Sequence, residues 1–308
     1  MQIIETSAGE YRKRFEVFPH IYNSVAFSEL NRHKAERLHY LLLEIARLRF
    51  GIILGEYEDG LYSPFSAPFG GFTSAKVQCF DFINEAAGLL KAYSSGMGKP
   101  VVVTLPPEFY NERQFAAEAN SLWRAGRVRT PEVNYHFLLS DFSRYDDVME
   151  RNARKNLHKA MAVGMEFRMI ERGDADGVRR AYGVIRRNRA EQGYPLRMSY
   201  EDVVATAEVI PADFFLVVHD GRDVAAAQVF HVSDGICQVI YWGDLREYSF
   251  MRPMNFLAYR LFEYYYRQGI RILDIGPSTE HGVPNYGLCA FKESIGCRSS
   301  LKFSFEIQ

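Results

Sequence analysis

The chain has 308 residues, with 37 basic and 38 acidic side chains, a net charge of −1 and 47% hydrophobic residues. This length and composition suggest a soluble protein of two domains, with enough apolar residues to form a core without disulfides. The balanced charge argues against bulk electrostatic binding of nucleic acid, although it does not exclude a local basic patch.

The cysteines and the N-terminus exclude several further classes of protein. No C-x-x-C pair and no zinc-binding pattern is present, so we expect no metal site and four reduced thiols, at Cys79, Cys237, Cys289 and Cys297. The first ten residues lack a basic segment followed by an apolar one, as a secretion signal would have. No apolar run approaches the roughly 18 residues of a membrane span. We therefore expect a cytoplasmic protein.

The first half of the chain alternates helical and strand patterns. Two short helices are expected at 10–19 and 24–35, with Ser24 as a possible N-cap of the second. Apolar runs at 38–46 and 48–56 predict a hairpin that continues toward Tyr62. The loop at 62–72 holds two prolines and a pair of glycines, so it is not a strand interior. It either shapes a ligand cleft or forms a rigid surface connection.

The rest of this half follows the same alternation. The expected elements are a helix, a buried strand, a second helix and a final strand, at 80–93, 101–105, 112–124 and 133–139. The polar turn from Asp141 to Arg144 is a candidate boundary, which gives an N-terminal half of 1–143 and a C-terminal half of 144–308.

The second half begins with a strongly basic segment. Residues 145–163 read as one helix whose cations fall on adjacent turns of one side: Arg151, Arg154, Lys155, His158 and Lys159. Such a run of charge is usually a solvated helix face. It is also suited to bind phosphate, because the guanidinium group of arginine is bidentate.

The remaining elements end in a polar, chemically rich segment. We expect strands at 167–170, 214–219, 224–232, 236–242, 270–275 and 301–307, and helices at 175–192, from Ser199, at 253–267 and from Asn285 to Gly296. An acid, a histidine and a lysine, at Asp274, His281 and Lys292, follow one strand end. Binding and catalytic residues concentrate on loops and helix starts of this kind.

Two motifs carry a resemblance to a known family. Residues 269–276 follow G-x-R-x-L-D-x-G, and residues 287–296 follow G-L-x-x-F-K-x-x-x-G. Residues 151–160 match a second pattern, R-x-x-x-R-K followed by K-A, in part. Together these segments resemble the FemAB-like branch of the GNAT acyltransferases, which includes peptidoglycan bridge aminoacyltransferases and acetyltransferase-like proteins.

The resemblance implies a fold and a place for the ligand. The expected fold class is α/β (α+β), with tandem GNAT-like halves, each a mixed, mostly antiparallel sheet flanked by helices. In this fold the sheet of the second half opens between the strands at 236–242 and 270–275, and that opening receives the acyl donor. The resemblance also favours a cleft at the loop 62–72.

The donor is acyl-CoA or aminoacyl-tRNA by the same resemblance. A standard GNAT binds pyrophosphate on a glycine-rich turn before its long helix, and here residues 243–253 lack the two glycines. Arg246 and Arg252, together with the helix N-terminus, still offer an anion site. The FemAB-like branch characteristically lacks this turn, and its best-known members use aminoacyl-tRNA.

Acyl transfer to an amine needs a proton acceptor, a stabilised oxyanion and a proton for the leaving group. The candidate bases are Asp274, Glu280 and His281, the candidate acids are Tyr241 and Tyr286, and Lys292 is the candidate electrostatic stabiliser. The expected acceptor is an amine, with a cell-wall precursor as one candidate, and tRNA is a candidate partner, whereas DNA is not. The competing interpretation is a non-catalytic GNAT-like module that binds an anionic, phosphorylated ligand.

Overall fold

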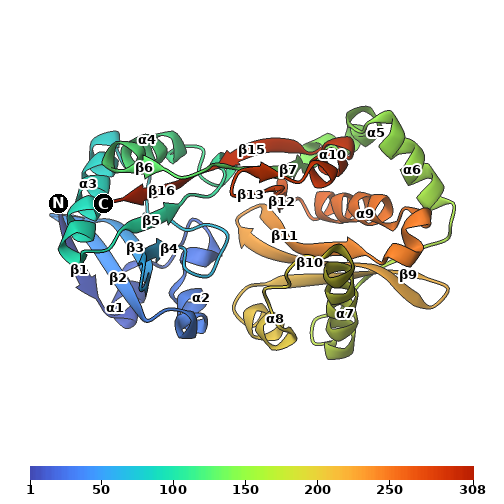
Figure 1. Ribbon diagram of the computed structural model, residues 1–308, viewed down its shortest axis with the longest axis horizontal. Helices are drawn as coiled ribbons and strands as arrows, with labels where there is room; N and C mark the ends of the chain where they lie inside the picture. The colour runs from blue at the N-terminus through green and yellow to red at the C-terminus, as the bar shows by residue number, and fades with distance from the viewer. The chain divides into compact units, whose positions relative to one another are not determined.

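The computed structural model describes residues 1–308 and consists of two compact units. The first unit comprises Met1–Val133, Thr279–Val283 and Ser300–Gln308, and the second comprises Asn134–Ser278 and Pro284–Ser299. Each unit is built on a mixed seven-stranded sheet with helices on both faces (Figure 1). The expected α/β class with two GNAT-like halves is confirmed.

The sheet of the first unit has the order β1-β2-β3-β4-β5-β16-β6. The predicted hairpin is present as β2 and β3, with β4 antiparallel to β3 and β5 parallel to β4. The strands are β1 (Gln2–Thr6), β2 (Arg37–Ile45), β3 (Arg47–Tyr57), β4 (Gly60–Ser63), β5 (Val101–Thr104), β6 (Arg127–Val128) and β16 (Ser304–Ile307). β1 and β6 were not predicted, because both are short edge strands with little apolar alternation.

Helices cover both faces of this sheet (Figure 1). α1 (Ala8–Arg14) and α2 (Val25–Leu30) pack on one face, and α3 (Phe80–Met97) and α4 (Phe115–Ala125) on the other. Ser24 caps α2 as predicted, since its hydroxyl accepts a hydrogen bond from the Phe27 amide at 3.2 Å. Gly98, at φ 64°, ends α3 in the left-handed conformation.

The sheet of the second unit has the order β15-β7-β12-β11-β10-β9-β8. β9, β10 and β11 form the predicted antiparallel meander. The strands are β7 (Glu132–Leu138), β8 (Glu166–Met169), β9 (Ala212–His219), β10 (Arg222–Ser233), β11 (Ile236–Asp244), β12 (Ile272–Pro277) and β15 (Arg298–Lys302).

Helices again lie on both faces of the second sheet (Figure 1). α7 (Ala175–Gln192) and α8 (Tyr200–Ala207) cover one face, and α5 (Tyr145–Val148), α6 (Arg151–Met161) and α9 (Pro253–Arg267) cover the other. Ser199 and Asp202 form a capping box at the start of α8. α10 (Tyr286–Ser294) follows β12 and the short hairpin of β13 (Thr279–Glu280) and β14 (Val283–Pro284).

Two strands lie in the opposite sheet from the one predicted. We expected 133–139 to close the first half and 301–307 to close the second. Instead β7 pairs with β12 in the second sheet, and β16 pairs with β5 in the first. Phe305 and Ile307 of β16 are buried in the apolar core of the first unit. Side-chain alternation defines a strand, but it does not identify the partner strand.

The single helix predicted at 145–163 is also wrong, because the chain forms α5 and α6 with a break between them. Met149 is extended, at φ −75° and ψ 146°, and its side chain is buried in the core of the second unit. The Glu150 amide donates to the Ser294 carbonyl oxygen at 2.9 Å rather than to a helical carbonyl. Tertiary packing therefore interrupts a segment whose local pattern is helical.

Candidate active site

The central strands of the second sheet pair over a short distance and then separate. β11 and β12 are parallel neighbours through three residue pairs, of which the last joins Gln238 and Asp274. The other side of β12 is irregular between Asp274 and Gly276, where its register with β7 shifts. From Val239 onward, β11 has no strand partner on this edge. The opening of the sheet between these two strands is confirmed.

Asp274 lies at the point of separation and is fully buried. Its Oδ1 accepts hydrogen bonds from Asn134 Nδ2 at 2.8 Å and from the Gly276 amide at 2.9 Å. Its Oδ2 accepts one from Gln238 Nε2 at 2.7 Å. The carboxylate thus links β7, β11 and the irregular turn of β12, which suits a group that holds the strands in place.

Lys292 reaches the same strand end from α10. Its Nζ donates to the carbonyl oxygens of Ile275, Gly276 and Pro277 at 3.1, 2.8 and 3.1 Å. These three bonds use all the hydrogens of the ammonium group. The side chain is 1% exposed, and this burial lowers the pKa of Lys292 to about 8, with a smaller opposing effect of Asp274.

The other predicted catalytic residues differ in their surroundings. Tyr241 is half-buried on β11 beyond the point of separation, packs against the apolar cluster beneath α7, and has its pKa raised by burial. Tyr286 is 79% exposed at the start of α10. Glu280 and His281 are exposed and lie in the segment Thr279–Val283, which belongs to the first unit. Around the end of β12 the structure thus brings together Asp274 and Lys292, with Tyr241 on the neighbouring strand.

The two arginines expected near the long helix are both exposed. Arg246 is engaged with the end of α7: its Nη2 donates to the Glu191 carbonyl oxygen at 2.6 Å, and its amide donates to Glu191 Oε2 at 2.9 Å. Arg252 precedes α9 in the left-handed conformation at φ 62°. Of the two side chains, only Arg252 has no protein partner.

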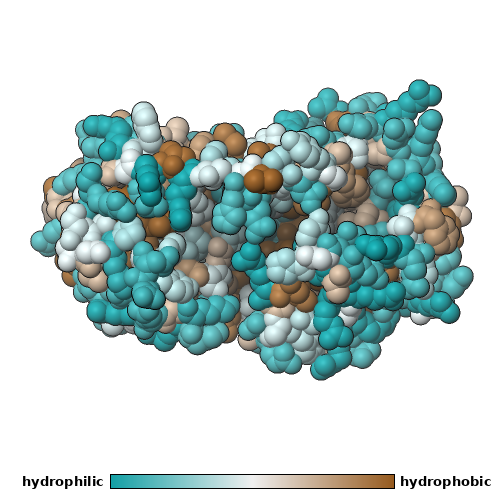
Figure 2. Space-filling view, in the orientation of Figure 1, coloured by the Kyte–Doolittle hydropathy of each residue, from teal (hydrophilic) through white to brown (hydrophobic).

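The basic residues of α6 face solvent with no acid on the helix. Arg151, Lys155, His158 and Lys159 are exposed, and Arg154 is half-buried with an Nε that has no acceptor. The molecular surface over α6 is hydrophilic (Figure 2). Arginines in a first turn oppose the helix dipole, so this arrangement does not favour the isolated helix.

Arg189 and Asp244 are two further candidate residues, on α7 and β11, that sequence reasoning did not identify. Arg189 lies in the last turns of α7 with its guanidinium carbon 5.1 Å from the ring centre of Tyr241 and 5.9 Å from that of Tyr194. Asp244 ends β11, and burial raises its pKa to about 6. An arginine near a helix C-terminus is common, so the sequence around Arg189 does not indicate a function. The sequence around Asp244 does not indicate one either.

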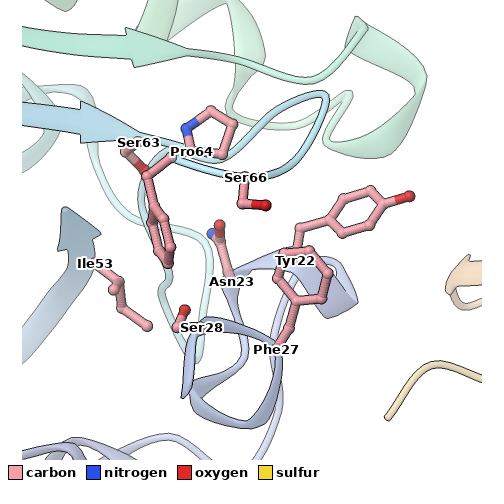
Figure 3. A pocket seen from close by; sticks show the side chains of 9 residues that line it. Tyr22, Asn23, Phe27, Ser28, Ile53, Ser63, Pro64 and Ser66 are labelled. Atoms are coloured by element: carbon pink, nitrogen blue, oxygen red, sulfur yellow. The ribbon is translucent and has the colours of Figure 1, made fainter. Parts of the chain in front are cut away.

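The aromatic loop at 62–72 folds inward. Phe69 is buried against the rings of His20, Tyr22 and Tyr110. The cavity beside this loop has a volume of about 10 Å³, which is room for roughly one water molecule. Figure 3 shows its lining, with Asn23 and Ser28 from the N-terminal helical segment facing Ser63, Pro64 and Ser66. This cavity is too small for the ligand cleft that the resemblance favoured.

No group of three or more histidine, cysteine or acidic side chains is arranged to hold a metal ion. The four cysteines form no disulfide. None of the helices combines the length and the apolar character needed to cross a membrane.

Comparisons with known proteins agree with this geometry. The model of the GNAT acetyltransferase domain matches residues 148–292. FemX superposes with a TM-score of 0.68 at 12% identity, over 100% of this chain and 98% of that chain. The C-terminal domain of a protein assigned as a lysylphosphatidylglycerol synthetase, from Agrobacterium fabrum, superposes with a TM-score of 0.62 at 13% identity. The superposition covers 98% of this chain and 93% of that chain.

A third similar structure is the GNAT-family acetyltransferase from Colwellia psychrerythraea, with a TM-score of 0.55 at 11% identity over 100% of both chains. No curated protein matches by sequence. At these identities the structural similarities establish the fold, and the domain match covers the segment that contains the separating strands, Asp274 and Lys292. Residues 148–292 therefore match a GNAT acetyltransferase domain, and the chain as a whole has the fold of FemX.

Proposed function

We propose that the protein transfers an acyl or aminoacyl group from acyl-CoA or aminoacyl-tRNA to an amine in the cytoplasm, with a cell-wall precursor as one candidate acceptor. The observation that carries this proposal is the separation of β11 from β12 beside the buried Asp274 and Lys292, within the matched GNAT segment. The missing glycine turn at 243–253 supports aminoacyl-tRNA as a donor class, because the FemAB-like branch that the chain resembles also lacks this turn.

Roles for the side chains follow from their chemistry. Lys292 provides a fixed positive charge where the tetrahedral intermediate becomes negative, and Asp274 positions the end of β12. Tyr241 donates the proton of the leaving group, and Asp244, whose pKa is raised to about 6, accepts the proton of the amine. Tyr286, which is exposed at the start of α10, is the alternative acid.

The proposal is tested by incubating the protein with acetyl-CoA or with a mixture of aminoacyl-tRNAs, each in the presence of a panel of amines. We expect mass spectrometry to detect saturable formation of an N-acylated product with one donor class. If a donor or a phosphorylated compound binds and no amine is acylated, the protein is instead a module that binds an anionic ligand.

The basic face of α6 is a proposed phosphate-binding surface. Reversing its exposed cations with Arg151→Glu/Lys155→Glu removes two phosphate contacts, so we expect weaker tRNA binding and a shallower dependence of log affinity on log salt, by about 1.4 for single-stranded contacts. The melting temperature should change little, because both side chains are exposed and position 151, in the first turn of α6, suits Glu.

The matched control for this variant is Arg12→Glu/Lys13→Glu, which reverses two exposed cations on α1. The two double variants should differ in tRNA affinity by at least tenfold. Equal affinities, measured by filter binding at several salt concentrations, would reduce the α6 cluster to a solvated helix face.

A further inference from the structure

Arg189 is a half-buried cation with no acid partner. Its Nε is buried and has no hydrogen-bond acceptor. Burial lowers the pKa of Arg189, and no carboxylate is among the groups that act on it. An arginine side chain does not lose its proton in proteins, so burial without a counter-ion is costly. A cost of this kind is retained where a ligand supplies the missing negative charge.

The two tyrosine rings support the guanidinium group by their faces. Their ring centres lie 5.1 and 5.9 Å from the guanidinium carbon of Arg189. Cation–π contacts of this kind attract the guanidinium group to the rings without using its hydrogen-bond donors. The Nη groups of Arg189 therefore remain available to an anion.

This arginine lies beside the opening of the sheet. Tyr241 belongs to β11 beyond the last residue paired with β12. Tyr194 accepts a hydrogen bond from Asn285 Nδ2 at 2.5 Å, and Asn285 caps α10, the helix of Lys292. Of the two cations, Arg189 and Lys292, only Arg189 keeps unused donors, because Lys292 is bound to three carbonyl groups.

We propose that Arg189 binds a carboxylate of the acceptor, so that the acceptor is an amino acid or a peptide rather than a simple amine. This inference rests on the proposed function. A single cation with a planar fork matches one planar monoanion, whereas a phosphate dianion calls for more positive charge. Coenzyme A and tRNA themselves carry phosphates and no carboxylate, and only a dicarboxylic acyl group would bring one with the donor, so we assign the carboxylate to the molecule that brings the amine. Arg189 is in these terms a specificity-determining residue.

The experiment compares L-lysine with cadaverine, which is the same diamine without the carboxylate. Their binding is measured by calorimetry at pH 7 to the wild type, to Arg189→Gln and to the control Arg186→Gln, which changes an exposed arginine of the same helix. We expect the wild type and the control to prefer lysine by about 10- to 100-fold, the value of charge-assisted hydrogen bonds, and Arg189→Gln to lose this preference.

The outcomes separate this inference from the proposed function. Equal binding or no binding of the two diamines by the wild type overturns the inference, as does a preference that survives in Arg189→Gln. Stronger competition by inorganic phosphate than by acetate would assign the subsite to a phosphate group and also overturn it. If lysine is preferred but no amine is acylated, the subsite stands and the transferase proposal fails. If amines are acylated whether or not they carry a carboxylate, the transferase proposal stands and the carboxylate subsite fails.

Discussion

Replacing Asp274 with alanine should lower the unfolding free energy by about 3–5 kcal/mol, because it leaves three buried donors without their charged acceptor. These donors are the side-chain amides of Asn134 and Gln238 and the backbone amide of Gly276. They belong to three different strands or turns, so their loss loosens the sheet where it opens. The melting temperature should fall on the order of 10 °C, as measured by calorimetry.

The control for this prediction is Asp234→Ala, which removes an exposed carboxylate from the turn between β10 and β11. It should leave the melting temperature within about 2 °C of the wild type. The melting temperature of Asp274→Asn should lie between those of the two alanine variants, because its amide oxygen retains two of the three hydrogen bonds. Similar melting temperatures for Asp274→Ala and Asp234→Ala would show that the carboxylate does not hold the strands.

Replacing Lys292 with methionine should lower turnover by about 100- to 1,000-fold, the usual cost of losing a group that stabilises an oxyanion. The folded state should persist, because two effects on stability oppose each other. Methionine fills a similar volume without the cost of a buried charge, but the carbonyl groups of residues 275–277 lose their donor. The exposed Lys91 provides a control, and Lys91→Met should keep full turnover.

The same variant makes a prediction about pH. The pKa of Lys292 is about 8 in the folded protein, below its ordinary value of 10.5. Between these values the unfolded chain binds more protons than the folded one, so this group makes stability rise with pH. From pH 8 to 10.5, the unfolding free energy of the wild type should rise by up to about 3 kcal/mol relative to that of Lys292→Met. Parallel stability curves for the two proteins would mean that Lys292 keeps an ordinary pKa.

The sequence predicts most closely those helices whose ends carry capping residues or a proline in the first turn. α7 spans the predicted 175–192 because Asp174 caps its start and Gly193, at φ 70°, ends it. α9 spans the predicted 253–267 because Pro253 suits a first turn. Asn285 likewise caps α10, through a hydrogen bond from the Leu288 amide at 3.0 Å.

What the sequence does not reveal depends on partners far along the chain. β7 and β16 have clear strand patterns, but their places are set by pairing with β12 and β5. The positions of Asp274 and Lys292 follow from their motifs, whereas the saturation of both groups by hydrogen bonds depends on residues outside them, such as Asn134 and Gln238. Arg189 has no acidic side chain near it, and this too becomes visible only in the folded unit.

The central claim is that acyl transfer takes place where β11 separates from β12, and hydrogen–deuterium exchange tests it most directly. From Val239 to Asp244, the amides on the separating edge of β11 have no strand partner, so they should exchange quickly in the free protein. A saturating amount of the donor that supports turnover should protect peptides covering 239–244 and the start of α10. Protection confined to the first unit, with 239–244 unchanged, would contradict the account.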